Sequence, residues 1–220
     1  MFVRGAGKSF CAGGDLEWMK RAANYSREEN RADALVLSNM LHAISTLPVP
    51  TIALVHGTAM GGGVGVISAC DIAVGVKGAM FALSEVKLGL LPATISPYVI
   101  GRIGPSHARR FFVTGERFDG AKAHEIGLLH EVVDDAAGLE EWAAKWRKEL
   151  TSASPTGVAA SKALVHAVAP LVPLPWDRTS AGAAAVMEDT ADRLADQRMS
   201  EEGLEGIAAF LEKRKPSWNA

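Results

Sequence analysis

The sequence predicts an α/β core followed by a helical C-terminal lobe, and three features lead to this prediction. Short apolar segments suited to buried strands alternate with helical segments in the first half of the chain. Helical periodicity and capping signals dominate after Ser106. The chain has 220 residues, of which 48% are hydrophobic, and this is enough for one full core. We expect the core over residues 1–150 and the helical lobe over residues 151–220.

The first elements expected are a helix and a buried strand. Ser26, with Glu29 three residues later, has the form of a capping box, and apolar residues then recur at helical spacing. Residues 51–56 (TIALVH) form a short apolar segment, rich in residue types that favour strands. We expect them to form a buried strand that leads to the glycine turn at residues 61–63.

That glycine turn is expected to start a helix of small residues from about Val64 to Ala69. Two further strands are expected at residues 72–76 and 79–83, with Glu85 just after the second. The alternation of strand, helix and strand is typical of an α/β core.

The remainder of the chain is expected to be mostly helical. The expected helices lie at residues 120–126, at 138–150, from Ser154-Pro155 onward and at 201–213. Pro155 fits the first position of a helix, where its missing N–H costs nothing.

Composition and charge limit the partners and the location. A formal net charge of −2 and a pI near 6.3 give no general attraction to nucleic acid or to a membrane surface. Cys11 and Cys70 are the only cysteines, and the opening residues lack a signal segment, so we expect a reducing, cytoplasmic setting. The six histidines show no metal-binding spacing, and no metal is expected.

Two glycine-rich turns are the most informative features of the sequence. They are residues 10–15 (FCAGGD) and residues 60–63 (MGGG). Glycine lets the main chain approach a ligand closely, so exposed backbone N–H groups can bind an oxyanion there. Glu85, flanked by apolar residues, supplies a carboxylate, and this combination suggests enolate chemistry. The patterns of a P-loop, a dinucleotide-binding turn and a serine nucleophile elbow are not met.

The chain resembles the enoyl-CoA hydratase/isomerase (crotonase) superfamily through several motifs in order. They are GAGKSFCAGGDL at residues 5–16, HG at 56–57 with MGGG at 60–63, ACDI at 69–72, SEVKLGLLP at 84–92, TGERF at 114–118, AKA and IGL between 121 and 128, and AFLEKRKP at 209–216. The resemblance implies a crotonase-type spiral β-β-α core and assembly as homotrimers or hexamers through the helical lobe.

The resemblance also implies an acyl-CoA thioester substrate whose carbonyl oxygen is held by the N–H groups of Gly14 and Gly62. CoA is then part of the substrate, and no separate cofactor is expected. Hydrogen-bond donors held at the developing oxyanion stabilise the transition state more than the bound substrate. Each donor lowers the activation barrier by about 3 kcal/mol. Further substrate contacts are implied for the other residues of the first turn, namely Ala12, Gly13, Asp15 and Leu16.

Glu85 matches the position of a catalytic glutamate of the superfamily, and we expect it to transfer protons. Desolvation by its apolar neighbours is expected to raise its pKa. These neighbours are Leu83, Val86, Leu88 and Leu90. Asp71, a second acid near the glycine-rich segments, is expected to serve as a structural hydrogen-bonding residue instead.

The chain departs from the two-glutamate pattern of hydratases, because the first family glutamate falls on Gly65. This glycine and residues 91–98, which replace a glycine-rich stretch, are similar to bacterial methylglutaconyl-CoA hydratases of leucine breakdown. We therefore expect a hydratase of a branched or carboxylated enoyl-CoA such as 3-methylglutaconyl-CoA, with Glu85 as the single acid and base. An enoyl-CoA isomerase, which also needs one base, is the alternative, and a catalytically weak acyl-CoA-binding or assembly subunit is another.

A second departure lies at the start of the chain. Family members usually carry a β-α-β segment before the stretch that begins at Gly5. We therefore expect an N-terminally shortened form of the fold, with a weaker site for the CoA nucleotide.

Overall fold

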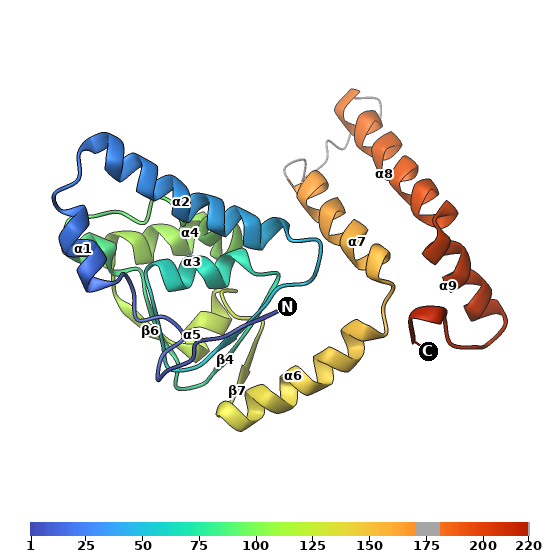
Figure 1. Ribbon diagram of the computed structural model, residues 1–220, viewed down its shortest axis with the longest axis horizontal. Coiled ribbons are helices and arrows are strands. Elements are labelled where there is room, and N and C mark those ends of the chain that lie inside the picture. The colour runs from blue at the N-terminus through green and yellow to red at the C-terminus, as the bar shows by residue number, and fades with distance from the viewer. Residues whose placement is uncertain (170–180, 220) are drawn as a thin grey trace. The chain divides into compact units, whose positions relative to one another are not determined.

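A computed structural model describes residues 1–169 and 181–219 (Figure 1). The chain forms two compact units, of which the first comprises residues 1–47 and 51–143 and the second residues 48–50 and 144–220. The expected boundary at residue 150 lies inside helix α6 (Ala136–Thr151), which contributes to both units. Residues 170–180 and 220 of the expected helical lobe lie outside the described residues. The role of this lobe in assembly stays a prediction.

The first sheet holds four parallel strands in the order β1-β2-β4-β7. They are β1 (Phe2–Val3), β2 (Ile52–Val55), β4 (Ile72–Val76) and β7 (Glu131–Val133). The two central strands are almost entirely apolar and buried, as strands covered on both faces must be. The predictions of β2 and β4 are confirmed, whereas β1 and β7 are too short to show a pattern in the sequence.

The second sheet holds β3 (Thr58–Met60), β5 (Met80–Ala82) and β6 (Arg117–Asp119). Strand β3 pairs with β5 in parallel, and β5 pairs with β6 in the antiparallel sense. Strand β2 leads to the glycine turn as expected, but through β3, which the sequence analysis does not predict. Gly57 adopts a φ of 62° between the two strands, and this turn carries the chain from the first sheet to the second.

Helices α2 (Arg27–Thr46), α3 (Gly62–Ala69) and α4 (Ser96–Thr114) lie next to one another in the first unit (Figure 1). The predicted capping box of α2 is confirmed, since the Glu29 N–H donates to Ser26 Oγ and the Ser26 N–H donates to the Glu29 carboxylate. Helix α3 is confirmed as well.

Helix α4 begins ten residues before the predicted helical region. Its interior contains Gly104, with φ 72° and ψ 162°, followed by Pro105. This pair interrupts the helical backbone and hides the first half of α4 from an analysis of periodicity. Helix α1 (Leu16–Ala22) is also missing from the sequence predictions.

The remaining helices are α5 (Gly120–Glu125), α6, α7 (Pro155–Val168), α8 (Ala181–Met199) and α9 (Glu201–Leu211), with short 3₁₀ turns η1 (Ser84–Leu88) and η3 (Ser217–Asn219). Helices α5, α6 and α9 are confirmed to within two residues at each end, and the predicted start of α7 is confirmed. Helix α8 is a further helix that the sequence analysis does not predict. Ser154 caps α7 by accepting a hydrogen bond from the Gly157 N–H, which explains where that helix begins.

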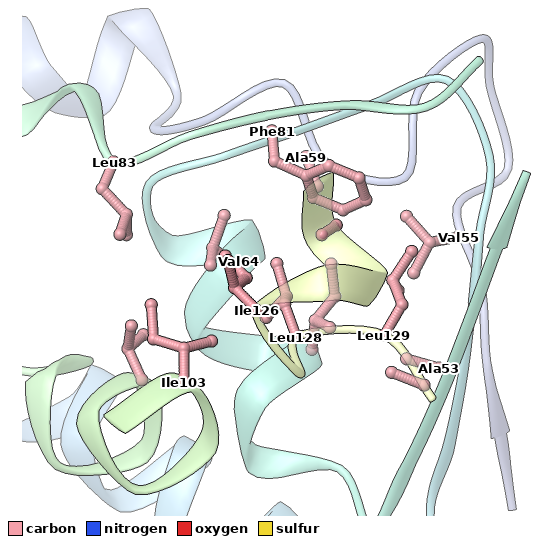
Figure 2. Close-up of a cluster of buried hydrophobic side chains, with 14 of the residues drawn as sticks. Ala53, Val55, Ala59, Val64, Phe81, Leu83, Ile103, Ile126, Leu128 and Leu129 are labelled. Atoms are coloured by element: carbon pink, nitrogen blue, oxygen red, sulfur yellow. The ribbon is translucent and has the colours of Figure 1, made fainter. Parts of the chain in front are cut away.

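The core of the first unit lies between its sheets and helices α3 and α4. Figure 2 shows Val64 from α3, Ile103 from α4 and Phe81 from β5 among the side chains of this cluster. Each of the three is 5% exposed or less. Burying one such side chain stabilises a fold by roughly 1.5–3 kcal/mol. The strands that lead to the glycine turns are therefore held in a rigid frame.

Asp71 connects the starts of the two central strands. Its Oδ2 accepts hydrogen bonds from the Thr51 N–H at 2.7 Å and from Thr51 Oγ1 at 2.9 Å, and the Asp71 N–H donates to Thr51 Oγ1 at 3.0 Å. Thr51 is fully buried. The predicted structural role of Asp71 is confirmed.

Replacing Asp71 with alanine should lower the free energy of unfolding by about 1–3 kcal/mol, because buried hydrogen-bonding groups of Thr51 lose their acceptor. Denaturant titration of the wild type and the variant measures this loss. Asp134→Ala is the matched control, since that exposed residue should change stability by no more than about 0.5 kcal/mol. Equal stability of the two variants would contradict the structural role.

Candidate active site

The two glycine-rich turns lie side by side because the segments before them are paired. The Cys11 N–H donates to Thr58 O at 3.0 Å, and the Met60 N–H donates to Cys11 O at 3.0 Å. This pairing is parallel. Parallel segments end at the same edge, so the turn at residues 12–14 meets the turn at residues 61–63.

Strand β5 brings Glu85 to the same edge. It runs parallel to β3 on the other side, and the Gly61 N–H donates to Ala82 O at 2.9 Å. Turn η1 then begins at Ser84, one residue before Glu85. A Cβ atom at Gly61 would lie 3.1 Å from Glu85 Oε1, so the carboxylate lies directly against the second glycine turn. Gly61 has a φ of 51°, a conformation that side chains disfavour.

The second turn also approaches the first very closely. A Cβ atom at Gly63 would lie 2.7 Å from the Cβ of Cys11. Such a contact does not occur between real side chains, so only glycine allows α3 to begin here. The helix N-terminus is thereby held beside the first turn.

The amide N–H groups of Gly14 and Gly62 are available to a ligand. Gly62 is the first residue of α3, and the first N–H groups of a helix have no acceptor within it. Within the described part of the chain, neither N–H has a hydrogen-bond acceptor. The helix dipole adds a partial positive charge at Gly62. Two donors are thus free at one edge, as an oxyanion hole requires.

Both glycines line a cavity of about 980 Å³. Most of its lining is apolar, with side chains from α1, α2, η1 and the segment before α4. The charged residues among the described lining are Glu85, Lys87 and Arg117. Apart from the turns themselves, the lining includes Leu16, Trp18, Met19, Leu37, Met40, Val66, Leu88, Leu90, Leu91, Pro92, Thr94 and Ile95.

The expected substrate contacts fall in two groups. Ala12, Gly13 and Leu16 line the cavity, as do Gly14 and Gly62. Asp15 is absent from this lining, and its Oδ1 accepts a hydrogen bond from the Trp18 N–H at 2.7 Å as the N-cap of α1. The side chain expected to touch substrate therefore has a structural task in this geometry.

Glu85 is the carboxylate of the cavity. Burial raises its pKa above the ordinary value of 4.5, and a hydrogen bond to the backbone of Glu85 opposes this only in part. Its Oε2 is buried without a hydrogen-bond partner among the described residues. The expected direction of the shift is confirmed, and an unpartnered oxygen is free to bind a water molecule or a substrate proton.

The expected cause of this shift, desolvation, is confirmed, although the apolar neighbours named for it differ in exposure. Leu83 is fully buried, but Val86, Leu88 and Leu90 are 40%, 63% and 55% exposed. Leu88 and Leu90 nevertheless line the cavity together with Glu85, so they form part of the wall around the carboxyl group. The desolvation comes from the cavity walls and from the glycine turn that lies against Glu85.

The described residues offer neither a metal-binding cluster nor a membrane-spanning helix. Nowhere in residues 1–169 and 181–219 do three or more His, Cys, Asp or Glu side chains gather as they would around a metal ion. Nor do these residues contain a helix that combines the length and apolarity needed to cross a membrane.

Sequence reasoning missed several cavity residues. Lys87 and Arg117 lie in motifs that carry the family resemblance but predict no role for either side chain, and Ile95 lies 30 positions after Gly65. Their meeting at one cavity depends on β5, β6 and the start of α4, and no spacing rule reveals it.

Comparison with known proteins identifies the family. Residues 2–220 match the sequence model of the Enoyl-CoA hydratase/isomerase family. The mitochondrial enoyl-CoA hydratase domain-containing protein 2 of Mus musculus is 32% identical over 218 residues, which cover 95% of this chain and 68% of that protein. The enoyl-CoA hydratase ACTT6 of Alternaria alternata is 39% identical over 164 residues, covering 74% of this chain and 53% of that protein.

Solved structures agree with this assignment. The crystal structure of an enoyl-CoA hydratase from Shewanella pealeana has a TM-score of 0.91 and 42% identity, and the match covers 99% of this chain and 77% of that one. A structure of Pseudomonas aeruginosa AtuE has a TM-score of 0.89 and 36% identity, covering 100% of this chain and 81% of that one. The predicted crotonase fold is confirmed, and the chain belongs to the enoyl-CoA hydratase/isomerase family.

Proposed function

We propose that this protein is an enoyl-CoA hydratase that adds water to a 2-enoyl-CoA thioester through an oxyanion-stabilised enolate. The observation that carries the proposal is the position of two free amide donors and one carboxylate at the same edge of the second sheet. Membership of the family implies an acyl-CoA substrate. The mostly apolar cavity suits the hydrocarbon part of such a substrate.

In the proposed reaction, the thioester carbonyl oxygen accepts hydrogen bonds from the N–H groups of Gly14 and Gly62. Glu85 removes a proton from water as the new C–O bond forms at C3, and the electron pair of the double bond moves to the carbonyl oxygen. The enolate then takes the proton from Glu85 at C2. The sum is the addition of one water molecule, with one residue acting first as base and then as acid.

The charges at the cavity support a carboxylated substrate such as 3-methylglutaconyl-CoA. Lys87 and Arg117 are exposed and line the cavity, and in the described residues neither forms an ion pair. A carboxylate at the far end of the acyl chain would supply the missing negative charge. Homotrimer or hexamer assembly, a cytoplasmic location and a place in leucine breakdown rest on the resemblance and stay predictions.

Enoyl-CoA isomerisation is a second candidate, favoured by the single carboxylate. Here Glu85 would remove a proton from C2 of a 3-enoyl thioester and return it to C4, with a dienolate held by the same two N–H donors between the two steps. This route needs no bound water and no second acid. A catalytically weak acyl-CoA-binding or assembly subunit is a third candidate, since Gly65 stands where the resemblance places a glutamate.

Replacing Glu85 with glutamine should lower turnover by about 10² to 10⁴-fold, because the residue that moves the proton is lost. Thioester binding should remain, since glutamine keeps the shape. Steady-state kinetics and calorimetric binding measure the two effects. Glu141→Gln, at an exposed position in the same unit, is the matched control. Unchanged turnover of the Glu85 variant would contradict the assignment.

The same assignment fixes the direction of the pH dependence. Glu85 must be ionised to accept a proton from water, and its pKa is raised by burial. The kcat/KM of the wild type should therefore rise with pH, with a midpoint above 4.5. An acid limb at or below that value would show that a different group acts as the base.

Replacing Gly62 with proline should remove one oxyanion donor and lower kcat by about 10² to 10³-fold. Proline is tolerated at the first position of a helix, and a Cβ atom at Gly62 would meet nothing within 4 Å. Gly62→Ala keeps the N–H and serves as the comparison for added bulk. Equal kcat values for the two variants would show that the Gly62 N–H does not stabilise the transition state.

A further inference from the structure

Position 65 is buried behind Ile95, a residue of the cavity wall. Gly65 comes three residues after Gly62 in α3, so the two lie on one face of the helix. The Cα–Cβ bonds of a helix tilt toward its N-terminus. A side chain at position 65 would therefore lean toward the turn that carries Gly62, and its Cβ would meet Ile95. A second acid would have to enter the site along this direction.

Ile95 already fills this space. A Cβ atom at Gly65 would lie 2.2 Å from Ile95 Cγ2 and 2.7 Å from Ile95 Cβ, and neither distance is compatible with two real atoms. Ile95 is 2% exposed and lines the cavity. Its side chain branches at Cβ and has a stiff χ1 angle, so it cannot swing aside as a long flexible chain would.

The backbone of Ile95 is also fixed. Ile95 is the N-cap of α4, and its carbonyl oxygen accepts hydrogen bonds from the Tyr98 N–H at 3.1 Å and from the Val99 N–H at 3.0 Å. Val99 is fully buried in the core. Any retreat of Ile95 from Gly65 would break the first turn of α4.

We propose that Ile95 is a specificity-determining residue that keeps this active site to a single carboxylate. It occupies the volume that a second acid at position 65 would need, and it offers an apolar wall to the acyl group in its place. Ile95 can occupy this volume only while residue 65 is glycine, because a Cβ atom there would collide with it. This inference deepens the proposed function and rests on it for the nature of the substrate, but the packing argument is independent of turnover.

One consequence is that Gly65→Glu alone cannot supply a second acid. Even a methyl group at position 65 collides with Ile95, so the single variant should fold less stably before any chemistry is gained. Ile95 must be removed first.

The packing claim is tested by the melting temperature of Gly65→Ala in four backgrounds, with Ile95 unchanged or replaced by valine, alanine or glycine. Valine keeps Cγ2, alanine keeps only Cβ, and glycine removes both colliding atoms. The loss of melting temperature caused by Gly65→Ala should therefore be large with isoleucine and valine, smaller with alanine and smallest with glycine. An equal loss in all four backgrounds would overturn the inference.

A matched control separates this collision from any general effect of a helical alanine. Gly101 lies in α4, and a Cβ atom there would meet nothing within 4 Å. Gly101→Ala should leave the melting temperature unchanged or raise it, since alanine favours helix over glycine. If Gly65→Ala behaved like Gly101→Ala in the wild-type background, Ile95 would not be the constraint.

The specificity claim is tested by adding Gly65→Glu to the Ile95→Gly background. The ratio of hydration of a straight-chain 2-enoyl-CoA to isomerisation of a 3-enoyl-CoA should rise at least several-fold over Ile95→Gly alone, because a second acid can now serve the added water. An unchanged ratio in a folded double variant would overturn the claim. If no variant, nor the wild type, turned over any thioester, the proposed function would fall while the melting series still tested the packing.

Discussion

The site depends on the parallel pairing of three short segments, namely residues 10–11, β3 and β5. Each of them ends at the same edge of the second sheet, and each is followed by a residue that the chemistry needs. The first leads to the turn with Gly14, the second to Gly62 at the start of α3, and the third to Glu85. No single side chain could replace this arrangement, because the two donors belong to the backbone. The core behind β5 and α3 keeps it rigid (Figure 2).

The same edge places a carboxyl group where its charge is poorly compensated. Glu85 is partly buried, one of its oxygens has no partner among the described residues, and its pKa is raised. A raised pKa means that the folded state binds the proton more tightly than the unfolded state, so ionising Glu85 costs stability as the pH rises above about 4.5. This loss of stability falls at the position where the proposed reaction needs a group that accepts a proton. Asp71 shows the opposite case, because its hydrogen bonds to Thr51 are satisfied and structural.

Much of the frame could be predicted from the sequence, because its signals are local. The capping box at Ser26 and the apolar segments of β2 and β4 act within a few residues of themselves. The elements that the sequence does not predict are either too short to show a pattern or depend on contacts between distant parts of the chain. Strands β1, β6 and β7 are two or three residues long, and Gly104-Pro105 hides the start of α4. The contact of Ile95 with Gly65 joins two elements 30 positions apart, so only the folded chain shows why position 65 is glycine.

The most direct test of the account is the product mass for four thioesters supplied separately to the purified protein. They are 3-methylglutaconyl-CoA, an uncharged 3-methyl-branched 2-enoyl-CoA, a straight-chain 2-enoyl-CoA and a 3-enoyl-CoA. The account predicts the gain of one water molecule, fastest with the carboxylated substrate. A 3-enoyl-CoA that becomes conjugated at constant mass, with no hydration of the other three, would contradict the hydratase and identify an isomerase. The absence of any reaction would contradict both.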